Sequence, residues 1–257
     1  MIVLIAPAKT LDYDSALSVK DFTVAEHLSE SKKLIKELQK KSPEELSSLM
    51  GLSQNLSMLN FERNMNWHIP KQPSEDIRQA MFAFKGDVYV GLDSESLSKA
   101  DIKYAQKNLA ILSGLYGLLR PLDLMYPYRL EMGTKMENVR GKNLYEFWGN
   151  KITESVNARA KENSSQGIVN LASVEYFSSV KIENLELPVY SPVFKDFKNG
   201  KYKIISFFAK KARGTMARFI IQNKIKNPSD LNKFNLDGYK YSKKDSSEFS
   251  PVFLRKN

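Results

Sequence analysis

The sequence predicts a mixed α/β fold of the α+β kind, in which one domain holds a mixed sheet surrounded by helices. Short apolar runs that contain β-branched residues, at positions 3–5 and 168–171, are typical of buried strands. Between them lie segments whose apolar residues recur at helical spacing. Because we find no long linker, internal repeat or low-complexity block, we assign residues 1–257 to a single domain.

Composition excludes several classes of protein. With 42% hydrophobic and 26% charged residues, the chain can form a core and is not a disordered polyelectrolyte. It has no cysteine, which excludes disulfides, zinc ribbons, thiolate-held iron–sulfur clusters and thiol nucleophiles, and which suits a reducing compartment. Since we find no signal peptide and no stretch that approaches 18 apolar residues, we expect a cytoplasmic protein without a membrane span.

The first element we expect is a short, fully apolar strand at residues 3–5. Pro7 ends this strand, and residues 8–12 read as a loop. Lys9 and Asp12 are therefore expected at a strand end.

Three helices are expected next. Residues 23–40 have the spacing of an amphipathic helix. A second helix begins after Ser42, which is followed by proline and two glutamates, and it ends at Gly51. A third helix begins near Ser53 and runs toward Trp67.

The two short helices at residues 42–60 allow two interpretations. A helix-hairpin-helix module would offer backbone N–H groups of its hairpin to a DNA phosphate. Such hairpins usually carry two glycines, whereas Gly51 here is followed by Ser53 at the second place, and no basic residue lies between Ser42 and Glu62. The alternative is an ordinary helical hairpin that packs its leucines into the core. These leucines are Leu46, Leu49, Leu52, Leu56 and Leu59.

The rest of the chain continues the mixture of strands and helices. We expect helices at residues 74–84, 99–108 and 214–223, a short helix capped at 227–230, strands at 88–90, 168–171 and 201–208, a turn at 85–87 and a buried run at 109–112. The pair Asp237-Gly238 is typical of a hairpin turn, and we expect it to join residues 234–236 to residues 239–241.

Positive charge is concentrated in one segment. The chain has a net charge of +10, and residues 195–226 alone contribute ten basic side chains and one acidic side chain. Aromatic and β-branched residues interrupt this segment, so it is expected to be folded material with a charged face. Such a face attracts anions, and nucleic acid is the most common large partner. The alternative is a solvated, lysine-rich surface.

Within this segment, residues 204–219 predict an anion site. We expect a strand that leads directly into a helix start near Gly214, where free backbone N–H groups and the helix dipole attract phosphate. Full charges would be added by Lys210, Lys211, Arg213 and Arg218. A Walker motif is absent from this segment, so nucleotide hydrolysis is not implied.

A second polar cluster lies in residues 118–133. Two prolines keep it irregular, and it carries Arg120, Asp123, Arg129 and Glu131 among aromatic residues. These side chains either line a site or form local ion pairs that stabilise a buried loop.

Metal chemistry has little support in the sequence. The two histidines, His27 and His68, lie far apart and lack a Glu-x-x-His spacing. A magnesium or manganese site made of carboxylates alone, or acid–base catalysis by the same groups, could use Asp12, Asp87, Asp123 or Glu131. No Ser-His-Asp signature is present, and we predict neither a cofactor nor a resident metal.

Several motifs together resemble the peroxide-stress protein family YaaA. The motifs lie at residues 6–12, 84–89, 112–117, 120–133, 170–173 and 210–214, so the resemblance spans nearly the whole chain. It implies a cytoplasmic bacterial protein with a mixed α/β fold of its own type, a positive cleft and a helix-hairpin-helix-like element linked to DNA binding. It also implies protection from hydrogen peroxide by keeping unincorporated iron low, which limits Fenton damage to DNA.

From the charge and the resemblance we draw two hypotheses. The first is a non-sequence-specific DNA-binding protein, with no membrane partner and only indirect iron handling, whose cleft is lined by basic side chains. These are Lys9, Lys85, Arg120, Arg129, Lys210, Lys211, Arg213 and Arg218. The second is an enzyme that acts on a phosphorylated or nucleic-acid substrate, with the carboxylates named above as acid, base or metal ligand. A third, direct iron handling, would need Fe²⁺ binding by carboxylates alone.

Overall fold

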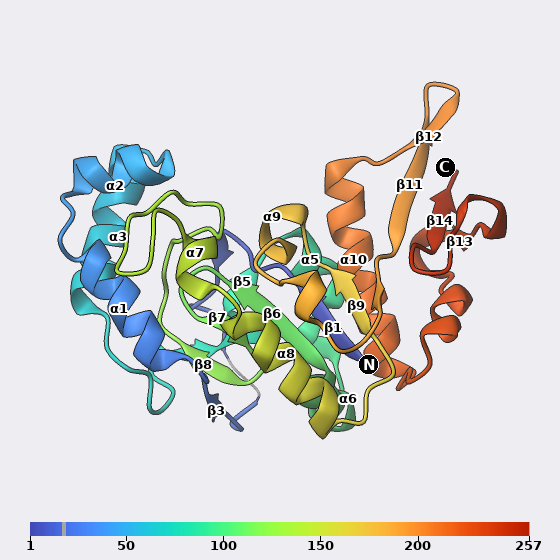
Figure 1. Cartoon of the computed structure of the whole chain (residues 1–257), viewed down its shortest axis with the longest axis horizontal. Helices are drawn as coiled ribbons and strands as arrows, with labels where there is room; N and C mark the ends of the chain where they lie inside the picture. Colours follow the sequence, from blue (N-terminus) through green and yellow to red (C-terminus); the bar gives the residue numbers. More distant parts are fainter. Residues whose placement is uncertain (17–18, 257) are drawn as a thin grey trace.

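The computed structural model describes residues 1–16 and 19–256, and a five-stranded sheet lies at its centre (Figure 1). The strand order is β10–β9–β1–β6–β7, in which the first four strands are parallel and β7 is antiparallel to β6. Parallel strands are covered on both faces, which explains why β1 is apolar and buried throughout. The strands are β1 Ile2–Ile5, β6 Leu109–Ser113, β7 Gly117–Leu119, β9 Ile168–Leu171 and β10 Val189–Tyr190.

Helices pack around this sheet. The two longest that contact it are α8, which packs against β1 and β7, and α10, which packs against β1 and β9. The α-helices are α1 Leu28–Leu38, α2 Pro43–Met50, α3 Gln54–Asn66, α4 Ala80–Ala83, α5 Asp87–Leu92, α6 Lys99–Asn108, α7 Leu144–Trp148, α8 Lys151–Glu162, α9 Val174–Phe177 and α10 Ser206–Gln222. Short 3₁₀ helices are η1 Ser94–Ser96, η2 Ile182–Asn184, η3 Pro228–Lys233, η4 Leu236–Gly238 and η5 Lys243–Asp245.

Three smaller sheets complete the fold. A four-stranded sheet, β12–β11–β14–β13, lies at the opposite end of the molecule from α1, α2 and α3, and its β11–β12 hairpin projects from the body (Figure 1). Its strands are β11 Val193–Lys198, β12 Lys201–Lys203, β13 Lys240–Tyr241 and β14 Val252–Arg255. The other two sheets are β3–β8–β4 and β2–β5, with β2 Thr10–Leu11, β3 Thr23–Val24, β4 Arg78–Gln79, β5 Phe84–Lys85 and β8 Asp123–Met125.

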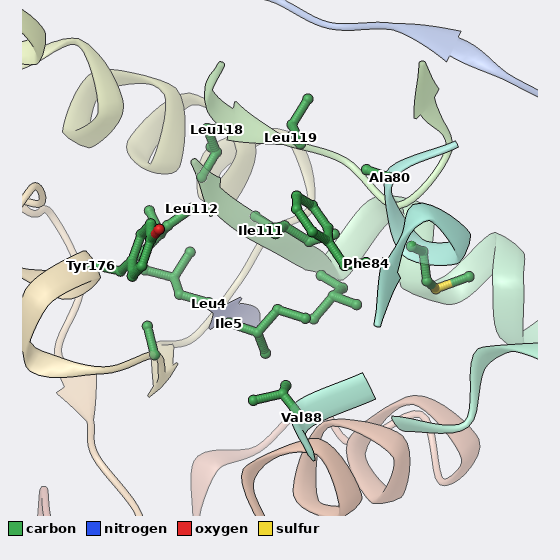
Figure 2. Packing of buried hydrophobic residues seen from close by; sticks show 14 of the residues in the cluster. Leu4, Ile5, Ala80, Phe84, Val88, Ile111, Leu112, Leu118, Leu119 and Tyr176 are labelled. Carbon is green, nitrogen blue, oxygen red and sulfur yellow. The ribbon is translucent and has the colours of Figure 1, made fainter. Parts of the chain in front are cut away.

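Nearly all of the buried hydrophobic residues described form one cluster, which runs from Met1 to Phe253. Figure 2 shows part of it, where Leu4 and Ile5 of β1 and Ile111 of β6 lie near Phe84 and Val88. All five side chains are less than 10% exposed. This packing joins the start of α5 to the centre of the sheet.

Two glycines allow α5 and α10 to pack closely. A Cβ atom at Gly91 would overlap the carbonyl oxygen of Lys211 and would lie 2.7 Å from the backbone nitrogen of Thr215. A Cβ atom at Gly214 would overlap the carbonyl oxygen of Val88. Because glycine has no Cβ, the two backbones can approach to this separation.

The cap signals located several helices correctly. Ser42 caps α2 with a reciprocal bond from Glu45, Gly51 ends it in the left-handed conformation (φ 62°), and Ser53 caps α3. The helix at 99–108, the strand at 168–171 and the short helix after Asn227 are also confirmed, although the last is 3₁₀.

Other expectations were wrong because tertiary contacts override local preference. Residues 23–27 are not helical, since β3 pairs with β8 and α1 begins only at Leu28. Residues 74–84 are not one helix, since Arg78 and Gln79 pair with β8 and only residues 80–83 are helical. Residues 88–90 lie in α5 and not in a strand, because this segment packs on α10.

Two corrections concern the C-terminal third. The strand expected at 201–208 ends at Lys203, and α10 begins at Ser206, two turns before Gly214. The expected hairpin at Asp237-Gly238 is absent, because β13 pairs with β14 instead and Phe234 is buried. The helix-hairpin-helix interpretation of residues 42–60 stays a prediction. Its alternative was wrong for Leu56 and Leu59, which are 42% and 40% exposed.

We expect Gly214→Ala to lower the free energy of unfolding by about 1–3 kcal/mol through overpacking against α5. Helix propensity alone favours alanine over glycine by about 1 kcal/mol and would raise the free energy of unfolding. A decrease therefore indicates the close contact between α10 and α5. Ala158→Gly, at an exposed position of α8, is the control and should cost about 1 kcal/mol by loss of propensity alone. Urea unfolding measures both, and an unchanged or more stable Gly214→Ala protein would contradict the contact.

Burial lowers the pKa of His27, which packs on Trp148 and whose Nε2 lies 2.9 Å from Ser155 Oγ. The charged groups around it are Glu26, Glu30, Lys151 and Glu154. The unfolded chain, with a histidine pKa near 6.5, binds the proton more readily than the folded chain does. This contribution to stability is therefore present above about pH 6.5 and is lost as the pH falls below it. We expect His27→Gln to reduce the loss of unfolding free energy between pH 7 and pH 5, as measured by urea unfolding at the two pH values, and an undiminished loss in this variant would contradict the assignment to His27.

Candidate functional site

A pocket of about 360 Å³ lies at the carboxyl ends of the central strands. Its walls are the segment after β1, the turn before α5, the loop after β8, the start of α9 and one face of α10. In open α/β sheets, ligands bind outside the carboxyl ends of strands, where neighbouring strands come from different parts of the chain. Here β1 lies between β6 and β9, which meets that description.

Three contacts hold these walls together. The hydroxyl of Tyr89 donates to the carbonyl of Ala6 at 3.2 Å, which ties α5 to the end of β1. The hydroxyl oxygens of Tyr128 and Ser113 lie 2.6 Å apart and tie the loop after β8 to the end of β6. Gly114 allows this loop to pass close by, because a Cβ there would overlap the carbonyl of Leu130.

Five of the eight predicted cationic residues line the pocket. They are Lys9, Lys85, Arg129, Lys210 and Arg213. Three of them have carboxylate partners: Lys9 Nζ lies 3.4 Å from Glu131 Oε1, Arg129 Nε donates to the same oxygen at 2.7 Å, and Lys85 Nζ lies 3.3 Å from Asp12 Oδ2.

The remaining two cations of the pocket, Lys210 and Arg213, are unpaired. Neither forms an ion pair with a carboxylate within residues 1–16 and 19–256. Burial lowers the pKa of Arg213, whose side chain is half-buried, although an arginine stays charged at neutral pH. A desolvated cation without a counter-ion gains free energy from a bound anion.

The other three predicted cations lie outside the pocket lining and are used in structural ion pairs. Arg120 Nη2 lies 2.9 Å from Asp123 Oδ1 and donates to the carbonyl of Val24. Lys211 pairs with Asp237 at 3.3 Å, and Arg218 pairs with Asp93 at 3.4 Å. The local ion pairs weighed for residues 118–133 are therefore both formed, by Arg120 with Asp123 and by Arg129 with Glu131.

The helix-start geometry expected near Gly214 was wrong. Because α10 begins at Ser206, Lys210 and Arg213 lie inside the helix and cannot present free N–H groups to an anion. Their spacing of three residues places them on the same face of α10 instead. They reach the pocket as side chains.

The four candidate carboxylates do not converge. Asp87 and Glu131 line the pocket, whereas Asp123 is 1% exposed and accepts from Thr23 and Arg120 elsewhere. Asp12 lies beside the pocket, and hydrogen bonds from Ser15, followed by Lys85, hold its pKa well below the usual range. Within the described residues, no three His, Cys, Asp or Glu side chains are arranged to hold a metal ion.

Several side chains of the pocket were not among the predicted site residues. Ser173 caps α9, Tyr176 packs in the wall, and Glu175 Oε1 accepts from the backbone nitrogen of Gly133 at 3.0 Å. Burial raises the pKa of Tyr128 and of Tyr176, so both remain protonated at neutral pH. The motifs at 120–133 and 170–173 pointed to these segments, but their roles depend on tertiary contacts.

A second group of cations lies on the projecting β11–β12 hairpin (Figure 1). Phe197 and Tyr202 face each other across the strands and are 38% and 40% exposed, and Lys256 Nζ lies 5.0 Å from the Phe197 ring. The lysines of the hairpin have no ion-pair partner in the described part of the chain. They are Lys195, Lys198, Lys201 and Lys203. The basic residues of the segment at 195–226 are thus divided between this hairpin, α10 and the residues after α10, where Lys224 and Lys226 lie.

Comparisons with known proteins place the chain among close relatives. A family model described as peroxide stress protein YaaA matches residues 1–245. A protein of Aliivibrio fischeri named UPF0246 protein is 53% identical over 255 residues, which cover 99% of this chain and 98% of the relative. A protein of Shewanella woodyi with the same name is 51% identical over 255 residues, which cover 99% of each chain.

We expect Asp123→Asn to lower the free energy of unfolding by about 2–3 kcal/mol, because the buried carboxylate of Asp123 accepts hydrogen bonds from Thr23 and Arg120 that an amide group cannot all replace. The control is Asp230→Asn, which removes an exposed pair with Lys233 and should change stability by less than about 1 kcal/mol. Thermal and urea unfolding measure both. Equal stability of the two variants would show that the Arg120–Asp123 pair has no structural role.

Proposed function

Because this chain belongs to the family of the peroxide stress protein YaaA, we propose that it protects DNA during peroxide stress by binding it without sequence preference. The binding surface comprises the pocket and the β11–β12 hairpin. This is a binding function, not a reaction.

The observation that carries the proposal is the pair of unpaired cations, Lys210 and Arg213, in the pocket wall. Arg213 is unpaired and partly desolvated, which is costly in the free protein, and Lys210 adds an exposed, unpaired positive charge beside it; a phosphate oxygen would supply the negative charge that both lack. The flanking cations Lys9, Lys85 and Arg129 already have carboxylate partners, so they contribute less net charge to an incoming anion.

The hairpin supports a polymeric anion as partner. Its unpaired lysines give a second set of phosphate contacts on a segment that projects from the body (Figure 1). A two-stranded ribbon has the dimensions that the major groove of B-DNA admits. Lysine contacts to phosphate carry no base information, which is why the binding would be independent of sequence.

Protection would then be local, because bound protein covers the DNA backbone. Lowering of unincorporated iron, which the family resemblance implies, would be indirect in this proposal. It would not require stoichiometric Fe²⁺ binding by the pocket carboxylates.

A second candidate function is favoured by the size and the acids of the pocket. A volume of about 360 Å³ suits a small phosphorylated molecule, and Asp87, Glu131 and Glu175 line the same space as the cations. Such carboxylates could act as acid or base on a substrate whose phosphate is held by Lys210 and Arg213. Turnover separates this enzyme hypothesis from simple binding.

The test is fluorescence-anisotropy binding to duplex, bubble-containing and single-stranded DNA at several salt concentrations, with and without Mg²⁺. For the double variant Lys210→Gln with Arg213→Gln, we expect affinity to fall roughly tenfold at physiological salt, with a log–log salt slope about two units less steep on duplex DNA. The loss should be similar for unrelated sequences. Lys198→Gln, Lys201→Gln and Lys203→Gln together should reduce the slope by a further three units or so.

The matched control replaces two lysines that have carboxylate partners, Lys40→Gln with Lys233→Gln, and should leave the slope nearly unchanged. Retained affinity in the Lys210 and Arg213 variant would contradict the assignment of the pocket. Cleaved or modified DNA after incubation, or competition by a mononucleotide at low concentration, would favour the enzyme hypothesis.

A further inference from the structure

Helix α3 buries polar side chains and leaves four large apolar side chains exposed, beside the exposed polar residues Asn55, Glu62 and Asn66. The side chains it buries are Ser57, Asn60 and Asn64. Its exposed side chains include four large apolar ones, Leu56, Met58, Leu59 and Met65, which are 42%, 46%, 40% and 52% exposed. An ordinary surface helix shows the reverse arrangement. The exposed apolar side chains are therefore not explained by packing of the fold.

The buried polar side chains of α3 bond mainly to the backbone of their own helix, and one further bond joins α3 to the segment after α1. Ser57 Oγ donates to the carbonyl of Gln54 at 2.9 Å, and Asn60 Nδ2 donates to the carbonyl of Leu56 at 2.8 Å. The carbonyl of Asn64 accepts from Gln39 Nε2 of the segment after α1 at 2.8 Å. A chemical change in the exposed side chains of α3 would therefore leave these hydrogen bonds intact.

The methionines are divided between the core and the two neighbouring helices α2 and α3. The chain has nine methionines and no cysteine, so thioethers are its peroxide-reactive sulfur groups. Six methionines are at most 3% exposed, namely Met1, Met81, Met125, Met132, Met136 and Met216. The three that solvent reaches all lie on α2 and α3, where Met50 is half-buried and Met58 and Met65 are exposed.

We propose that Met58 and Met65 form a peroxide-reactive site and that their oxidation makes the side of α3 that they share more polar. They lie seven residues apart, which is two helical turns, and so they share one side of α3. The proposal does not depend on DNA binding, because it involves neither the pocket nor the β11–β12 hairpin.

The reaction is a two-electron oxidation of each thioether by one molecule of hydrogen peroxide. A lone pair of the sulfur attacks one peroxide oxygen, the sulfur–oxygen bond forms and the oxygen–oxygen bond breaks. The leaving hydroxide takes up the remaining proton, so the products are one sulfoxide and one water. The sulfoxide is polar, and methionine sulfoxide reductases return it to the thioether.

Because six of the other methionines are buried, peroxide would oxidise Met58 and Met65 without disturbing the core. Oxidation of a core methionine would disrupt packing, whereas oxidation of Met58 and Met65 changes only an exposed face. The reduced protein therefore presents two thioethers on this side of α3 and the oxidised protein two polar sulfoxides, with the same fold.

The first test is peptide mapping by mass spectrometry during exposure of the folded protein to hydrogen peroxide. We expect sulfoxide to form at Met58 and Met65 roughly tenfold faster than at the six buried methionines, with Met50 between the two classes. The variant Met58→Leu with Met65→Leu should lose the fast class, and Met81→Leu, a core control, should retain it. Equal rates at buried and exposed positions in the folded protein would overturn the proposal.

The second test follows the surface itself with the neutral dye Nile red. Wild-type protein should lose dye fluorescence after peroxide treatment, with unchanged circular dichroism, and the Met58→Leu, Met65→Leu variant should retain its fluorescence. Restoration of the wild-type signal by a methionine sulfoxide reductase would support the proposal. Dye binding that peroxide leaves unaltered in the wild type would overturn it.

Discussion

The close contact between α5 and α10 is the constraint on which the pocket depends. Gly91 and Gly214 leave no Cβ between the two backbones, so the helices lie nearer than side chains would allow. The start of α5 is held to the end of β1 by Tyr89, and α10 carries Lys210 and Arg213. The contact therefore brings two cations of the C-terminal third to the edge of the central sheet. A wider separation would leave them on an ordinary helix surface.

Some cationic side chains of the molecule are held in ion pairs, and others have no carboxylate partner among the residues described. Arg120, Lys211 and Arg218 are consumed by ion pairs that join loops and helices, and their contribution is mainly to structure. Lys210, Arg213 and the lysines of the β11–β12 hairpin have no such partner among the residues described. An anion is attracted mainly by the cations that have no carboxylate partner. Fewer side chains are therefore available to bind an anion than the number of lysines and arginines suggests.

The two ends of the molecule differ in chemistry. The end that contains β11 and β12 is basic and aromatic, whereas the end that contains α2 and α3 presents leucine and methionine (Figure 1). Within the described residues, no helix has both the length and the apolar composition needed to cross a membrane. The exposed leucines and methionines of α3 lie on a helix that buries Ser57, Asn60 and Asn64, and Gln39 donates to the carbonyl of Asn64.

Much of the fold could be predicted from the sequence where a short-range physical rule decides. Strands β1 and β9 follow from apolar runs, α2 and α3 from their caps, and the family from motifs spread along the chain. The basic segment and five lining cations were also found in this way, because charge and loop position are local properties.

The tertiary structure alone decided what depends on distant partners. The segment at 88–90 has a strand-like composition and is helical because α10 packs on it, and α10 begins at Ser206, where local alternation predicted a strand. Arg120 and Arg129 belong to one predicted irregular segment and both have carboxylate partners, but β8 lies between them, and Arg129 lines the pocket whereas Arg120 does not. The sequence by itself determined the family, the class of fold and the positive charge, because these depend on composition and on short patterns. Which cations stay free and which methionines stay exposed depends on contacts between residues far apart in the chain, and only the folded molecule specifies those.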